Sequence, residues 1–164
     1  MADEVDRIVE AWRRERPDLD VEPMEVLSRV TRLARQLDLA RRSTFLAHGL
    51  EVWAFDVLSA LRRSGEPYRL SPSQLLTQTL VTSGTMTNRI DRLAGLGLVE
   101  RHPDPRDRRG VLVQLTDTGR QRVDNALREL LEIERQLLVA LSGDDQKLLA
   151  GLLRDLSIGF DTDS

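Results

Sequence analysis

The chain has 164 residues, of which 40% are hydrophobic, so it is long enough for one domain with a core but not for a second full domain. It contains no cysteine, which excludes disulfides, thiolate metal sites and cysteine-based peroxide sensing, and its two histidines are too few to predict a metal site. The net charge is −3, and we find neither an apolar run of about 18 residues nor a basic-then-apolar leader, so we expect a cytoplasmic protein without a membrane span.

The first predicted helix covers residues 3–16. Val5, Ile8, Val9 and Trp12 recur along one of its faces at helical spacing. A helix this short is not stable alone, so the stripe must dock on another element, with Trp12 as its anchor. Plain packing is the simplest role for this tryptophan.

Two longer helices are predicted next. Residues 21–45 form the first, with Pro23 in its first turn. Residues 50–64 read as a core helix, because they are strongly apolar and stop at a glycine. Asp56 is out of place there, since a buried carboxylate is costly unless it is paired or hydrogen-bonded. We therefore expect Asp56 either to face solvent or to have a partner.

Residues Thr82 to Gly97 predict a recognition helix. Met86, Ile90 and Leu93 recur at i, i+4 and i+7 and define its buried face, while the opposite face carries small and polar residues that can approach base edges. A short strand at 68–70 and a helix capped by Ser71 come before it, which makes a helix-turn-helix. The candidate DNA-contacting residues are Ser71, Ser83, Gly84, Thr85, Thr87, Asn88 and Arg92.

A wing is predicted after the recognition helix. Residues 98–101 and 111–115 read as strands, joined by a polar, Pro-containing loop over 102–110. From residue 62 to 109, nine arginines stand against five acidic residues, a local charge of +4 that leaves −7 elsewhere. This favours a basic face toward DNA, although a solvated helix and an ordinary charged hairpin would be the simpler alternative. The candidate wing contacts are Arg106, Arg108 and Arg109.

The chain ends in two predicted leucine-rich helices, the second opened by a capping box of Ser142 and Asp145. Their leucines exceed what a small winged-helix domain can cover. We therefore predict a mainly α fold with a small β-wing, a winged helix-turn-helix that forms an intertwined homodimer through its N- and C-terminal helices. The predicted division is 1–48 for N-terminal dimerisation helices, 49–116 for the DNA-binding domain and 117–164 for C-terminal dimerisation helices.

Two other classes of function are the alternatives. The sequence has no Gly-rich phosphate loop, no histidine with a nucleophile, and no H-x-E or C-x-x-C spacing, so we predict neither an enzyme nor a cofactor. The second alternative is a helical module that binds another protein through its leucine-rich ends. A monomer in solution would favour that module, and a dimer would favour the DNA-binding regulator.

Between residues 21 and 160 the sequence resembles the MarR family of bacterial transcription regulators. The most specific part is LVERHPDPRDRRGVLVQLTDTG, residues 98–119. The resemblance implies a dimeric DNA-binding repressor in which Asp107 braces the wing and a tip arginine enters the minor groove. Arg106, Arg108 and Arg109 are the candidates for that arginine.

A narrower resemblance is to the urate-responsive branch of the family, the HucR, PecS and TamR type. That branch has a tryptophan on an extra N-terminal helix, an aspartate in a W-x-F-D-V-L-like run and an arginine within S-G-x-x-T-N-R-I. Here these residues are Trp12, Asp56 and Arg89. The branch also has an asparagine shortly after the aspartate, where this chain has Ser64 or its neighbours.

The narrower resemblance implies a ligand pocket shared with residues 1–48. Urate or another anionic aromatic compound, such as a phenolic anion, would enter beneath Trp12, pair with Arg89 and repel Asp56, which would release DNA. Arg89 lies about 65° from the centre of the buried helix face, so it can turn inward and become the partner of Asp56. The alternative is that Asp56 and Arg89 form only a structural ion pair and that Trp12 only packs.

Overall fold

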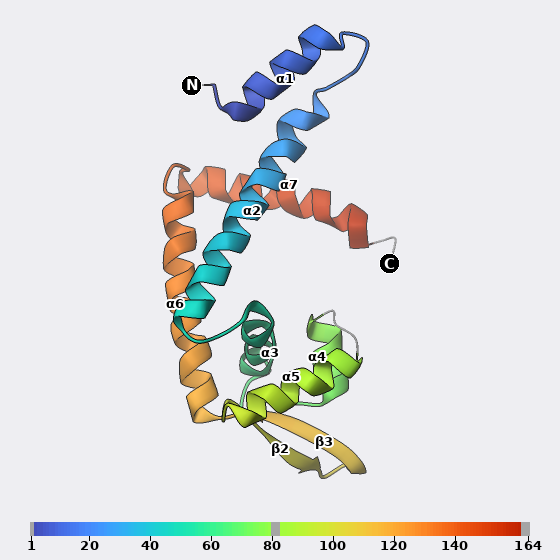
Figure 1. The fold of residues 1–164 in the computed structure, drawn as a ribbon, viewed down its shortest axis with the longest axis vertical. Helices are drawn as coiled ribbons and strands as arrows, with labels where there is room; N and C mark the ends of the chain where they lie inside the picture. The colour runs from blue at the N-terminus through green and yellow to red at the C-terminus, as the bar shows by residue number, and fades with distance from the viewer. Residues whose placement is uncertain (1, 80–82, 162–164) are drawn as a thin grey trace.

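The computed structural model describes residues 2–79 and 83–161 and shows two regions, a body of helices with a small sheet and a frame that contains the two longest helices (Figure 1). The body contains α3, α4, α5 and the sheet, and the frame contains α1, α2, α6 and α7. In chain order the elements are α1 (Glu4–Glu15), α2 (Pro23–Ala47), α3 (Val52–Arg63), β1 (Arg69–Leu70), α4 (Pro72–Thr79), α5 (Ser83–Gly95), β2 (Val99–Asp104), β3 (Asp107–Leu115), α6 (Asp117–Leu138) and α7 (Gly143–Asp161).

The core of the body is built around α3. This helix is apolar on nearly all sides, which is the pattern of a helix surrounded by other elements, and Val57, Leu58 and Leu61 are completely buried. Phe55 stacks on Phe45 of α2, with 3.9 Å between ring centroids and 12° between ring planes. The predicted core helix is therefore confirmed.

The recognition helix α5 packs its predicted face inward. Met86, Ile90 and Leu93 are all buried, as their spacing predicts. Gly97 follows with a φ of +68°, a left-handed conformation that ends helices, and the backbone N–H of Leu98 donates to the Leu93 carbonyl at 3.0 Å. Thr82, the first residue of the predicted recognition helix, lies outside the described residues.

The sheet is antiparallel with strand order β1-β3-β2. The expected loop over 102–110 is wrong, because β2 continues to Asp104 and β3 begins at Asp107. Pro103 is tolerated inside β2 and pairs with Val111, since β2 is an edge strand with one side free of ladder bonds. Polar composition and prolines therefore mark a long exposed hairpin here.

The start of α6 is fixed to the end of the recognition-helix segment. The hydroxyl of Thr116 accepts a hydrogen bond from the backbone N–H of Gly119 at 3.0 Å and donates to the Gly97 carbonyl at 2.8 Å. A Cβ atom at Gly119 would lie 2.1 Å from the Leu98 carbonyl oxygen, so a glycine is required. Thr116 thus caps this helix and also joins two elements.

At the top of the frame, Val5 and Val9 of α1 pack on Val21, just before α2, and on Met24 in the first turn of α2. Its capping box reinforces the contact, because Arg29 of α2 donates to Asp3 at 2.9 Å and to Asp6 at 2.5 Å. The helix α1 is thus held by its own chain.

Much of the apolar surface of the frame is uncovered. No described residue of α7 is buried, although leucines recur along it. Among the described helices none is long and apolar enough by itself to cross a membrane, and only α2 and α3 together, across a 79° bend, pass that test of length and composition. The large exposed apolar residues include Val26, Leu27, Val30 and Leu33 of α2 and Leu148, Leu152, Leu153 and Leu156 of α7.

Candidate DNA interface and adjoining pocket

The outer face of α5 presents the predicted polar residues to solvent. Gly84, Thr85, Thr87 and Asn88 are exposed, on the side away from the buried stripe. Small side chains at the start of a helix allow close approach to a groove, and threonine and asparagine can hydrogen-bond base edges. The geometry therefore suits a helix that enters the major groove.

Ser71 has a structural role at the start of α4. Its hydroxyl accepts a hydrogen bond from the backbone N–H of Gln74 at 3.2 Å and lies 2.8 Å from the hydroxyl of Ser73. It is thus the expected N-cap, and its contact with DNA stays a prediction. The side chain of Ser83 lies outside the part of the chain that the structure describes.

The wing projects from the same end of the body as α5 (Figure 1). Arg106 is exposed at the hairpin turn, where its backbone N–H donates to the Asp104 carboxylate at 2.8 Å. At the root of the wing, Arg101 pairs with Asp91 of α5 at 2.6 Å and so ties the wing to the recognition helix. The roles of Arg108 and Arg109, whose side chains lie outside the described part, and of Asp107 as a brace stay predictions.

Arg92 lies on α5, and its guanidinium contacts two residues from outside that helix. Its Nη2 donates to Glu51 Oε1 at 2.5 Å, and its guanidinium carbon lies 4.9 Å from the centre of the Trp53 ring. The other oxygen of Glu51 accepts from the indole N–H of Trp53 at 2.7 Å. These hydrogen bonds, first from Trp53 and then from Arg92, lower the pKa of Glu51 below its ordinary value of 4.5.

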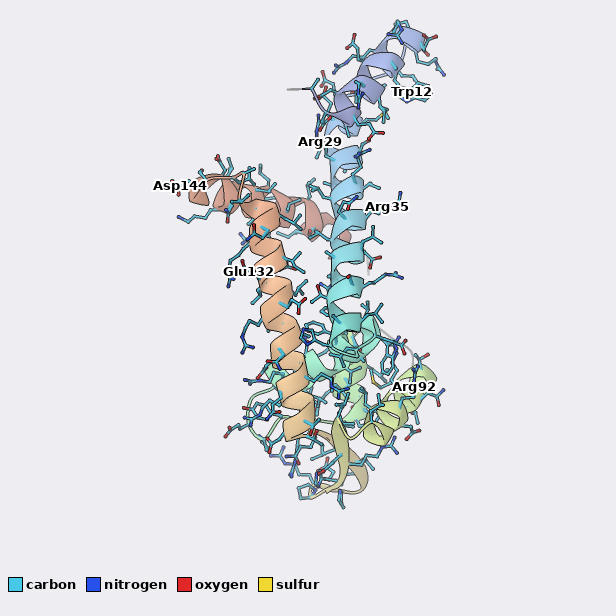
Figure 2. The ribbon with its side chains drawn as sticks, turned by 60° about the vertical axis from the view of Figure 1, so that its left-hand side comes forward. Trp12, Arg29, Arg35, Arg92, Glu132 and Asp144 are labelled. Carbon is cyan, nitrogen blue, oxygen red and sulfur yellow. The ribbon has the colours of Figure 1, made fainter. Side chains whose placement is uncertain are left out.

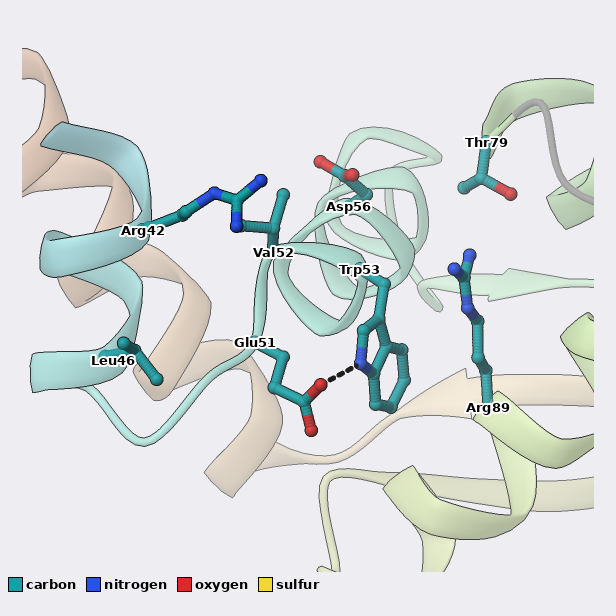
Figure 3. Close-up of a pocket in the computed structure, with 8 residues that line it drawn as sticks. All are labelled: Arg42, Leu46, Glu51, Val52, Trp53, Asp56, Thr79 and Arg89. Carbon is teal, nitrogen blue, oxygen red and sulfur yellow. Dashed lines mark hydrogen bonds between the residues drawn. The ribbon is translucent and has the colours of Figure 1, made fainter. Parts of the chain in front are cut away.

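A cavity of ≈ 470 Å³ opens beside α5, where α2, α3 and α4 also contribute (Figure 3). Two arginines and two carboxylates face it, and an indole ring stands between Glu51 and Arg89. The mixture of a flat aromatic surface with cations fits a small, planar, charged ligand. The lining residues are Arg42, Leu46, Glu51, Val52, Trp53, Asp56, Thr79 and Arg89.

Asp56 and Arg89 both line this cavity, but the expected ion pair between them is wrong. Asp56 pairs with Arg41 of α2, with 3.6 Å between the charged atoms, and its side chain is 45% exposed, so it is not a buried carboxylate. The guanidinium of Arg89 lies 5.5 Å from the centre of the Trp53 ring. The Arg89 guanidinium thus contacts the ring of Trp53, where the sequence predicted a contact with the Asp56 carboxylate.

Trp12 lies far from this cavity within one chain. It is on α1 at the far end of the frame, whereas Arg92 marks the cavity end of the molecule (Figure 2). Its side chain is exposed, and it is not among the residues that line the cavity. A single chain therefore does not bring Trp12 together with Asp56 and Arg89.

Six residues that line the cavity were not predicted from the sequence, and four of them are polar or aromatic, namely Arg42, Glu51, Trp53 and Thr79. Trp53 stood within the W-A-F-D-V-L run, three residues before Asp56, so helical spacing placed the two on one face. The other three come from separate elements and carry no shared spacing. Among the described residues, no group of three or more His, Cys, Asp and Glu side chains could hold a metal ion.

Comparison with known proteins identifies the family. The sequence profile of the MarR family matches residues 48–110. The HTH-type transcriptional regulator PecS of Dickeya dadantii is 41% identical over 150 residues, which cover 92% of this chain and 90% of that protein.

Solved structures agree with this assignment. A cysteine-to-serine variant of MarR from E. coli in complex with operator DNA is 26% identical, with a TM-score of 0.68 over 84% of this chain and 99% of that one. BpsR of Bordetella bronchiseptica, whose DNA binding is regulated by 6-hydroxynicotinic acid, is 29% identical, with a TM-score of 0.61 over 78% of this chain and 92% of that one. The winged helix-turn-helix predicted from the sequence is confirmed, and the chain belongs to the MarR family of DNA-binding transcriptional regulators, which are not enzymes.

Proposed function

We propose that this regulator is a cytoplasmic repressor that binds a palindromic operator as a homodimer and is released from it by a small anionic aromatic ligand such as urate. The observation that carries the ligand proposal is the position of Arg89. This cation belongs to the recognition helix and at the same time lines the cavity beside Trp53.

The exposed apolar frame supports the homodimer. Leucines along α7 and the middle of α2 would be hidden if the terminal helices of two chains packed together. Such a dimer would place two recognition helices on successive major grooves of one DNA face.

The proposed division into 1–48, 49–116 and 117–164 separates the chain by function and not into separately packed cores. The core itself crosses those bounds, since Phe45 and Leu130 belong to the cluster around α3. A change in the dimerisation helices would therefore reach the DNA-binding domain through packed side chains.

The chemistry of the cavity supports an anionic aromatic ligand. Trp53 offers a ring face for stacking, and Arg42 and Arg89 offer guanidinium groups for a carboxylate or an enolate oxygen. The volume of ≈ 470 Å³ is in the range of small-molecule sites. The DNA binding of a relative, BpsR, is regulated by 6-hydroxynicotinic acid, which is itself an aromatic acid.

Release would follow from a movement of the Arg89 guanidinium toward the bound ligand. An anion in the cavity draws the guanidinium toward itself and repels Asp56, so the recognition helix moves relative to α3. The ligand must bind the released state more tightly than the DNA-bound state, because equal affinity would shift nothing. Trp12 can join the ligand site only through a second chain or a new position of α1.

A gel-shift titration on the protein's own upstream DNA tests this proposal, with urate and 6-hydroxynicotinate as the added compounds. Binding should be reversed by at least one of them in the native protein, and the compound should lose that effect in Arg89→Ala. Arg128→Ala is the matched control, because Arg128 lies on α6 and pairs with Asn125. Release that persists unchanged in Arg89→Ala would show that the cavity is not the ligand site.

A further inference from the structure

We propose that Glu51 is a built-in competitor of DNA phosphate for the Arg92 guanidinium and so limits the affinity of the recognition helix for DNA. This inference depends on the DNA-binding function of the family and on Arg92 as one of the proposed DNA contacts. It does not depend on the identity of any ligand.

The pair is placed where phosphate can reach it. The side chains of Arg92 and Glu51 are 61% and 52% exposed, and the Arg92 Nη2 to Glu51 Oε1 distance is 2.5 Å. A carboxylate and a phosphate offer the same kind of charged oxygen acceptor to a guanidinium. Glu51 therefore occupies the donor group that a phosphate on the outer face of α5 would use.

Glu51 is held in place from outside the recognition helix. It belongs to the link between α2 and α3, and the indole N–H of Trp53 binds its second oxygen at 2.7 Å. The ring of Trp53 also lies under the Arg92 guanidinium, at 4.9 Å. Arg92 must leave this position to turn toward DNA, whereas Glu51 keeps its bond to Trp53.

The alternative role for the same pair is positioning, and it predicts the opposite sign. If Glu51 held Arg92 in the orientation that DNA requires, loss of the carboxylate would weaken DNA binding. If Glu51 competes with phosphate, its loss strengthens DNA binding. One substitution thus separates the two roles.

The test is the DNA affinity of the full-length protein carrying Glu51→Gln, measured by fluorescence anisotropy at low salt. Glutamine keeps the shape and can still accept from Trp53, but it removes the charge. We expect a dissociation constant about two- to fivefold lower per subunit, the size expected for an exposed ion pair. Arg92→Ala should weaken binding, and Glu51→Gln should bring no gain in the Arg92→Ala background.

Glu100→Gln is the matched control for net charge. Glu100 is an exposed carboxylate on β2, and its carboxylate oxygen lies 3.5 Å from His102 Nε2. Any gain from this control comes from general electrostatics and should persist in the Arg92→Ala background. A comparable thermal midpoint for all variants ensures that folded proteins are compared.

Each contrary outcome has a distinct meaning. Weaker DNA binding by Glu51→Gln would overturn the inference in favour of positioning, and unchanged binding would overturn it by showing that Glu51 does not compete with phosphate. A gain that persists without Arg92 would overturn it in favour of net charge. Full DNA affinity in Arg92→Ala would remove Arg92 from the DNA contacts and overturn the inference as well. None of these results would alter the ligand-release experiment on Arg89.

Discussion

The body and the frame of this molecule differ in how much of their apolar surface one chain buries. In the body, α3 is enclosed by α2, α4, α6 and the sheet, and its apolar residues are buried within one chain. In the frame, α7 and the middle of α2 carry comparable leucines that stay exposed. The difference fits the proposed homodimer, in which a second copy would cover the apolar face of the frame.

The largest effect should come from truncating the core of the body. Leu58→Ala removes a completely buried side chain at the centre of α3 and should lower the free energy of unfolding by about 2–5 kcal/mol. Leu148→Ala, the same change at a 63% exposed position of α7, should affect stability only in a manner that depends on protein concentration. Urea denaturation at two protein concentrations measures the stability change in both variants. Equal, concentration-independent losses would contradict the comparison.

Charge placed on α7 should separate the two copies while leaving the body folded. Leu152→Glu combined with Leu156→Glu would bury two carboxylates in the proposed interface, so light scattering should report a monomer. DNA affinity should fall about 100-fold or more, because the two recognition helices are no longer linked.

Lys147→Glu is the control for this charge change, at an exposed position of α7 paired with Asp144 at 3.2 Å. It should remain a dimer with nearly unchanged DNA affinity. A double variant that also stays dimeric would place the interface elsewhere.

The smallest effect should come from the ion pairs that hold α1 on α2. Hydrogen bonds lower the pKa of Asp3, first from the backbone of Asp6 and then from Arg29, and the pKa of Asp6, first from the backbone of Asp3 and then from Arg29. Since these pKa values are lowered on folding, their stabilising effect is complete above the ordinary value of 3.8 and is lost as the pH falls through the lowered values. Acid should therefore loosen α1 before it unfolds the body.

Asp3→Asn with Asp6→Asn mimics this protonation at pH 7. Hydrogen exchange of the α1 amides should become faster, while exchange in α3 stays unchanged. Asp18→Asn is the control, because its pKa is also lowered, by Arg16, but within the loop after α1. Unchanged exchange in α1 of the double variant would show that Val5 and Val9 alone hold the helix.

Most of the fold was predictable because local signals agreed with tertiary burial. The stripe of Met86, Ile90 and Leu93 lies inward as its period requires, and Thr116 caps α6 as its residue type favours. The wing strands were predicted too short. Whether a polar, proline-containing segment forms an edge strand depends on a neighbouring strand, here β3, and the segment's own composition does not report that neighbour.

The candidate site was less predictable than the fold. Helical geometry showed that Arg89 could turn inward, but it could not choose between Asp56 and Trp53, which lie one turn apart on the same helix. Arg92 was assigned to DNA because its own helix face is polar. Its partner Glu51 precedes α3, and only the packing of α5 against that end of α3 brings the two together.

The hydroxyl of Thr116 has a mechanical consequence. It binds the first turn of α6 and the carbonyl of Gly97 just after α5, and Gly119 lets the two backbones touch. Because these contacts couple the two elements, a tilt of α6 would move the recognition helix with it. In a homodimer, the angle between the two α6 helices would set the distance between the two recognition helices. An operator whose half-sites lie a few base pairs farther apart would therefore bind more weakly.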